Sequence, residues 1–152
     1  MKVVKKGDEG ELIFVSQMNA RGINTRTFPS DYKMQVAGID VLCNNEVAID
    51  VKYNYKKGRH NGKAFGYFYI ENDTGGWLFN PNKISEIVVH VCQSDTNQCC
   101  WYFRDEARKN VQIRTHKGSI CKINALSNTR YIHHGWDSLA EYIRSQTEVS
   151  VL

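Results

Sequence analysis

The chain has little proline and no long apolar segment, and both shortages restrict the kind of protein it can be. Its 152 residues include only two prolines, Pro29 and Pro81. No stretch reaches the roughly 18 consecutive apolar residues of a membrane-spanning helix. No secretion signal or lipidation motif is recognisable at either end. We therefore expect a protein that has no membrane partner.

Disulfide bonds are not expected either. The chain has five cysteines, an odd number that cannot pair completely within one molecule. Without a secretion signal, such cysteines are typical of a reducing compartment. We expect free thiols and a cytoplasmic location. The five are Cys43, Cys92, Cys99, Cys100 and Cys121.

A zinc site is conceivable but is not predicted. His90, Cys92, Cys99 and Cys100 fall in two neighbouring apolar segments. However, the chain has no Cys-x-x-Cys spacing, and the adjacent Cys99 and Cys100 would point to opposite faces of a strand. Buried free cysteine is the simpler interpretation of these residues.

The composition that is present suits one globular domain. Hydrophobic residues make up 41% of the chain, enough to build a core, and no repeat or linker divides residues 1–152. The net charge of +4 permits a polyanionic partner but does not require one. The positions of the charged residues must therefore show whether the partner is polyanionic.

Hydrophobic periodicity predicts a mixed α/β fold, with a central β-sheet flanked by helices. Leu12, Val15 and Met18 recur at helical spacing, and Glu11 lies on or beside the stripe that they form. A carboxylate facing a core is unusual unless it has a function. The expected helices are 8–21, 105–110 and 136–145, and the expected strands are 38–42, 47–53, 87–92 and 99–103.

Two of these strands form a hairpin that carries a candidate active site. Side chains alternate along a strand, so Asp50 and Lys52 share one face while Ile49 and Val51 face the core. If residues 44–46 form the loop, Asp40 falls opposite Asp50 on that same face. A two-residue turn would instead place Asp40 opposite Ile49 and separate the carboxylates.

This set of groups is suited to phosphodiester hydrolysis. Two close carboxylates raise each other's pKa unless a divalent cation lies between them, and oxygen ligands suit Mg²⁺, with Mn²⁺ as a substitute. We expect Asp40, Asp50 and the carbonyl of Val51 to bind the metal, with Glu11 holding a metal-bound water or a second metal. Lys52 would orient or deprotonate the attacking water. The alternative is that these are ordinary surface residues of a hairpin.

The order of these motifs resembles the PD-(D/E)XK nuclease superfamily. The motifs are Gly7 to Glu11, then Gly38-Ile-Asp40-Val-Leu, then Ile49-Asp50-Val-Lys52, and they cover about the first 53 residues. The layout is similar to small phage or intron homing endonucleases and to archaeal Holliday-junction resolvases. Two positions depart from the pattern: Ile39 stands where proline is usual, and Asp50 stands where glutamate is usual.

The resemblance implies a restriction-endonuclease-like fold in which Asp40 and Asp50 are metal ligands, Lys52 is the catalytic lysine and Glu11 is the helix carboxylate. It also implies a bacterial or phage-infected host cell. We expect a single nuclease domain over 1–152, with a catalytic core at about 7–103 and a helical elaboration at about 104–146.

The expected partner is DNA. A glycine-containing basic loop follows the catalytic strand and is placed to contact phosphates, although a solvated loop would have the same composition. Its candidate DNA-binding residues are Lys56, Lys57, Arg59, His60 and Lys63. One site cuts one strand, so cutting both strands would require a homodimer or a higher oligomer. Three functions stay open: a site-specific duplex endonuclease, a junction-resolving endonuclease and a non-catalytic DNA-binding module.

Overall fold

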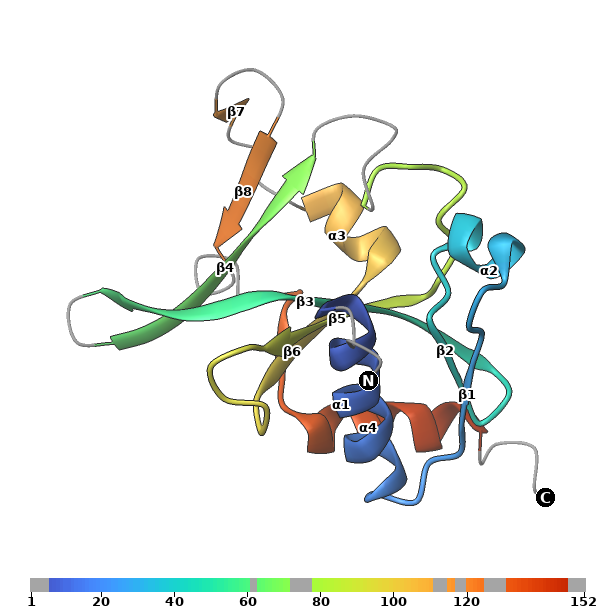
Figure 1. Ribbon diagram of the computed structural model, residues 1–152. Coiled ribbons are helices and arrows are strands. Elements are labelled where there is room, and N and C mark those ends of the chain that lie inside the picture. The colour runs from blue at the N-terminus through green and yellow to red at the C-terminus, as the bar shows by residue number, and fades with distance from the viewer. Residues whose placement is uncertain are drawn as a thin grey trace, which may run out of the picture.

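The computed structural model describes residues 6–60, 63–71, 78–110, 115–116, 120–124 and 131–147, with side chains for 8–53, 78–109 and 131–147. These residues form a mixed α/β fold in which helices flank a sheet (Figure 1). The fold class predicted from the sequence is confirmed. No helix in these ranges combines the length and the apolarity needed to cross a membrane.

The described residues form four helices and nine strands. The helices are α1 (Lys6–Asn19), α2 (Tyr32–Ala37), α3 (Arg104–Asn110) and α4 (Trp136–Thr147). The strands are β1 (Thr25–Thr27), β2 (Val41–Cys43), β3 (Val47–His60), β4 (Lys63–Glu71), β5 (Ile87–Cys92), β6 (Cys99–Phe103), β7 (Thr115–His116), β8 (Ile120–Asn124) and β9 (His133–His134).

The long strand β3 organises the sheet. Its first half pairs with β2 on one side, antiparallel, and with β5 on the other, parallel. Its second half pairs with β4 in a two-stranded ribbon, and β8 joins the far part of β4. In Figure 1 this ribbon extends away from the body of the molecule that contains α1 and α4. β6 pairs with β5 and β9 pairs with β6, both antiparallel.

Each face of the central sheet has its own core. On one face, β3 and β5 pack against Phe14 and Met18 of α1 and Leu139 and Ile143 of α4. The other face packs Val88, Cys100 and Tyr102 around Ala107 of α3. β5 is buried at all six positions because it lies between β3 and β6 and is covered on both faces.

Helix α1 corrects one detail of the sequence analysis. Leu12 is 61% exposed, whereas Phe14 is fully buried, so the core stripe runs through Phe14 and Met18. Gly10 lies on this buried side, where an added Cβ would come within 2.9 Å of the Cβ of Tyr53. The absence of a side chain at Gly10 lets α1 approach β3 closely, and Glu11 is the next residue.

The β2–β3 hairpin has the register that the site hypothesis requires. Cys43 pairs with Val47 and Val41 pairs with Ile49, so residues 44–46 form the connection. Asn44 and Asn45 both have positive φ, at 49° and 59°, a conformation that asparagine tolerates better than most residues. The odd-numbered loop is confirmed, and the two-residue alternative is wrong.

Several element boundaries differ from the predicted ones. Gly38 is the left-handed cap of α2, with φ at 69°, so the strand expected at 38–42 begins only at Val41. The basic segment expected as a loop is instead strand, because residues 56–60 pair with 63–67. The hairpin of β5 and β6 is confirmed, and so are the two C-terminal helices. Residues 104–146 also contain the short strands β7, β8 and β9.

Candidate active site

Asp50 lies near the middle of the sheet, and its carboxylate is almost completely buried, at 2% exposure. Lys52 Nζ lies 3.3 Å from Asp50 Oδ1, and the lysine side chain is partly open to solvent. The strand alternation places both residues on one face, as predicted, while Ile49 and Val51 belong to the core on the other face. The structure therefore brings the predicted acid and lysine of β3 together.

Asp40 reaches the same place from the end of α2. Its backbone N–H donates to the carbonyl of Ile49 at 2.9 Å, the residue that the β2–β3 register already pairs with Val41, so the regular pairing ends at Val41. Its Oδ2 accepts a hydrogen bond from the backbone N–H of Val51 at 2.8 Å. Asp40 is thus held against β3 beside Asp50. The role predicted for the carbonyl of Val51 stays a prediction.

Glu11 completes the carboxylate cluster from α1. Its side chain forms a hydrogen bond with that of Asp40, and burial raises its pKa above the ordinary value despite this bond. Glu11, Asp40 and Asp50 therefore meet although they come from three separate segments of the chain. We call these three residues with Lys52 the acidic cluster.

The surroundings of Asp40 favour its protonated form. Burial first, and next the charge of Asp50, raise the pKa of Asp40 from its usual 3.8 to about 8, while the Val51 hydrogen bond opposes the shift. A hydrogen bond between two carboxyl groups requires a proton on one of them. The hydrogen bond between Glu11 and Asp40 therefore agrees with a proton held by this pair.

Sequence reasoning missed Arg104, which is also buried. It is the first residue of α3, is only 2% exposed, and its Nη2 lies 2.9 Å from Asp50 Oδ2. Side chains alternate between the two faces of β6. Cys100 and Tyr102 pair with His90 and Val88 of β5, and Arg104, two residues after Tyr102, continues on the same face. That signal becomes readable only once β5 is known to pair with β3.

The chemistry of the donor set suits a hard divalent cation. Burial, and after it the charge of Asp50, raise the pKa of Asp40, and a cation between the carboxylates would relieve their repulsion. In the described part of the chain, no three His, Cys, Asp or Glu side chains are already arranged to hold a metal. Binding would therefore require the carboxylates to turn toward a shared ion.

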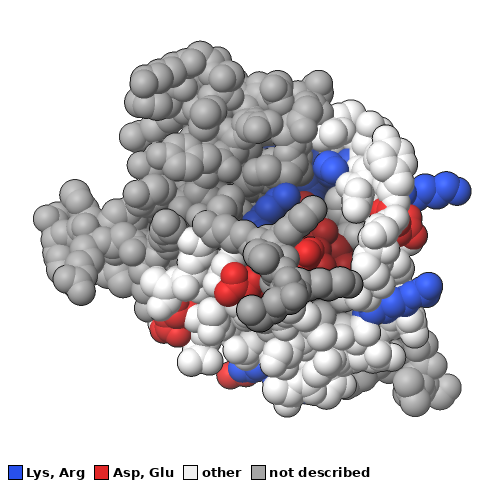
Figure 2. Space-filling model, viewed as in Figure 1, with Lys and Arg blue, Asp and Glu red and all other residues white. Residues whose placement is uncertain are grey.

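The cations of the β3–β4 ribbon lie beyond this cluster along β3. The backbone register pairs Lys56 with Tyr67, Arg59 with Ala64 and His60 with Lys63. The side chains of the five candidate DNA-binding residues lie outside the described ones, so their role stays a prediction. In Figure 2, acidic side chains gather near the middle of the visible face and Lys and Arg side chains lie beside them.

The cysteines and His90 fit the structural interpretation. Cys99 and Cys100 belong to the cores on opposite faces of the sheet. Burial raises the pKa of Cys99 to about 12, and it lowers the pKa of His90, whose Nε2 lies 2.8 Å from the hydroxyl of Tyr102. Cys99 is thus separated from Cys92 and Cys100, and no group of three possible metal ligands is found among the described residues. The side chain of Cys121 lies outside the described residues.

Comparisons with known proteins give one structural likeness. No family model matches the chain, and no curated protein matches it. The fold is similar to that of a bacterial homing endonuclease, I-Ssp6803I, with a TM-score of 0.56 over 95% of both chains. The two sequences are 10% identical, so the likeness concerns the fold.

Proposed function

We propose that this protein is a metal-dependent DNA endonuclease of the PD-(D/E)XK type that hydrolyses phosphodiester bonds at the acidic cluster. The observation that carries the proposal is the convergence of Asp40, Asp50 and Lys52 with a helix carboxylate, Glu11. Chance placement on a solvent-exposed hairpin would not bury Asp50 or bring Asp40 into contact with a helix carboxylate. The likeness to a homing endonuclease supports a site-specific, duplex-cutting enzyme.

In the proposed site, Asp40, Asp50 and the carbonyl of Val51 would hold Mg²⁺ or Mn²⁺, with Glu11 beside them. When bound, the ion would neutralise phosphate charge and make a water more acidic. Lys52 is the group that can act on the substrate, because its ammonium lies at Asp50 Oδ1 and its side chain is partly exposed. There it would orient the attacking water and stabilise negative charge developing on the phosphate oxygens.

The β3–β4 ribbon is the proposed DNA-binding element. A two-stranded ribbon fits the major groove, and it continues directly from the strand that carries Asp50 and Lys52. DNA held by the ribbon would therefore pass close to the acidic cluster. One cluster cuts one strand, so cutting both strands calls for a homodimer or a higher oligomer.

The test compares cleavage of a long duplex and of a synthetic four-way junction by the purified protein with Mg²⁺, Mn²⁺ or EDTA. We expect cleavage with either metal and none with EDTA. Asp50→Asn keeps the shape of the side chain and removes its charge, and Lys52→Ala removes the ammonium. Each should slow cleavage at least about 100-fold, the usual scale for loss of an acid–base group.

Lys109→Ala serves as the control, because Lys109 is an exposed lysine on α3. It should cut like the wild type. Preference for the duplex would support the homing or restriction type, and preference for the junction would identify a resolving enzyme. DNA binding without cutting under any metal would leave a binding module and overturn the proposal.

A further inference from the structure

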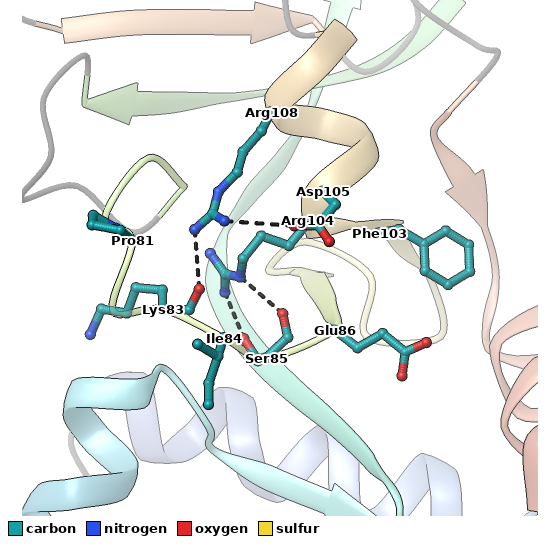
Figure 3. A pocket seen from close by; sticks show the side chains of 9 residues that line it. All are labelled: Pro81, Lys83, Ile84, Ser85, Glu86, Phe103, Arg104, Asp105 and Arg108. Carbon is teal, nitrogen blue, oxygen red and sulfur yellow. Dashed lines mark hydrogen bonds and ion pairs between the residues drawn. The ribbon is translucent and has the colours of Figure 1, made fainter.

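Arg104 is a buried cation that the proposed chemistry does not use directly. A guanidinium removed from water costs several kcal/mol unless charged and polar groups compensate it. Here Nη2 donates to Asp50 Oδ2 at 2.9 Å and to Ser85 Oγ at 2.6 Å, and Nε donates to the Ser85 carbonyl at 2.9 Å. Figure 3 shows Arg104 beside Ser85, in the segment before β5. Arg104 therefore binds this segment and, through Asp50, the acidic cluster at the same time.

The two oxygens of Asp50 have different surroundings. Oδ2 faces Arg104, and a Cβ added at Gly38 would lie 3.6 Å from it. The Lys83 side chain covers Gly38 from outside, since the same Cβ would lie 2.8 Å from Lys83 Cδ. Oδ1 faces Lys52, whose side chain is partly exposed. The partly exposed lysine therefore lies on the Oδ1 side of the carboxylate.

We propose that Arg104 is a positioning residue that holds Oδ2 of Asp50, so that Asp50 presents only Oδ1 to a divalent cation. This inference rests on the proposed function, because it assigns a role within the same site. Arg104 also offsets part of the negative charge of Asp50. The site is thus built to bind its cation through one oxygen of Asp50.

The shape of arginine matters for this role. A planar guanidinium presents several N–H groups in fixed directions and can hold a carboxylate and a serine together. A lysine at this position would keep the charge but has a single nitrogen at its tip. Arg104→Lys should therefore release either Asp50 or Ser85 and leave the carboxylate free to rotate.

Arg108 provides a matched control on the same helix. It is one turn further along α3, and it donates to the carbonyls of Leu78, Asn80 and Lys83. It therefore holds the same segment before β5 that Arg104 holds, and no contact with Asp50 is among its bonds. A purely structural role for Arg104 would give Arg104→Lys and Arg108→Lys similar effects.

The experiment measures Mn²⁺ binding to the full chain without DNA, by the electron spin resonance signal of free Mn²⁺. The Mg²⁺ concentration for half-maximal cleavage is measured beside it. We expect Arg104→Lys to weaken Mn²⁺ binding and to raise the Mg²⁺ requirement by about 10- to 100-fold, the usual effect of losing a partner of a metal ligand. Arg108→Lys should leave both values at the wild-type level.

Ser85→Ala keeps the inference testable if Arg104→Lys does not fold. It removes only the 2.6 Å bond to Arg104 and should weaken Mn²⁺ binding in the same direction by a smaller factor. Wild-type Mn²⁺ affinity in folded Arg104→Lys, or in Ser85→Ala when Arg104→Lys does not fold, would overturn this inference alone. Absence of Mn²⁺ binding by the wild type would overturn the proposed function as well.

Discussion

At the scale of single residues, Asp40 is the most unusual group in the acidic cluster. Its side chain is held by the N–H of Val51, its neighbours include two other carboxylates, and it keeps its proton up to a pKa of about 8. A protonated aspartate at neutral pH is unfavourable for a metal ligand. A cation would have to displace that proton, so metal binding and pH are coupled.

This coupling predicts how stability depends on pH without metal. Between about pH 4 and pH 8 the unfolded chain releases the Asp40 proton while the folded chain keeps it. Each rise in pH across this window therefore favours the unfolded state, and metal-free protein should unfold at less urea at pH 8 than at pH 5. The change should be much smaller in Asp40→Asn, which cannot titrate there.

In the same urea unfolding experiment, the stabilising effect of Mg²⁺ should show the opposite dependence on pH. The ion binds the ionised cluster, so its stabilising effect should be greater at pH 8 than at pH 5, and it should fade in Asp40→Asn. A wild-type urea midpoint that is no lower at pH 8, with an unchanged response to Mg²⁺, would show that Asp40 does not hold this proton.

At the scale of elements, β3 performs two tasks in one strand. Its first half carries Asp50 and Lys52 between β2 and β5, and its second half forms the ribbon with β4. The division falls between Lys52 and Tyr55, where the pairing with β5 is irregular. A single continuous strand thereby links the proposed cutting site to the proposed DNA-binding element.

If the ribbon binds DNA, its cations should set part of the salt dependence of DNA affinity. Each phosphate that a protein neutralises contributes about 0.9 to the slope of log affinity against log salt concentration for duplex DNA. Replacing the ribbon cations Lys56, Lys57, Arg59 and Lys63 with glutamine should lower that slope by about this amount for each phosphate that the ribbon no longer binds. The slope is measured by fluorescence anisotropy of a labelled duplex. The ribbon substitutions are made in an Asp50→Asn background, which should bind DNA without cutting it. An unchanged slope would place the DNA elsewhere, and Lys109→Gln provides the comparison.

The β2–β3 hairpin shows what a sequence can determine. Alternation along one strand and the parity of residues 44–46 were enough to place Asp40 beside Asp50, because both rules act between residues close in the chain. The parallel pairing of β3 with β5 could not be found in this way. It joins Ile49 to Ile87 across a long segment, and only packing of the complete molecule selects that partner.

Arg104 was missed for the same reason. A charged residue after the apolar strand β6 suits the first turn of a helix and gives no hint of burial in the sequence. The prediction for Leu12 was wrong in the opposite direction. Leu12 fits the helical spacing of apolar residues in α1, yet the core lies on the side of Phe14 and Met18. For both residues, the position of the neighbouring sheet determines whether the side chain is buried or exposed.

At the scale of the whole molecule, two cores hold the sheet in place while three segments deliver the cluster. α1 brings Glu11, the segment after α2 brings Asp40, and β3 brings Asp50 and Lys52. α3 supports Asp50 through Arg104, on the same face of the sheet. The carboxylates are therefore positioned by the tertiary structure. Their assembly is what distinguishes a candidate active site from a charged hairpin.

The central claim is that this assembly cuts DNA, and plasmid cleavage tests it most directly. Wild type and Lys52→Ala, purified in parallel, are mixed with supercoiled plasmid in EDTA, and excess Mg²⁺ is then added. We expect nicked and then linear DNA to form only with the wild type, while both proteins bind the plasmid. Supercoiled DNA that persists with the wild type, or equal cutting by Lys52→Ala, would contradict it.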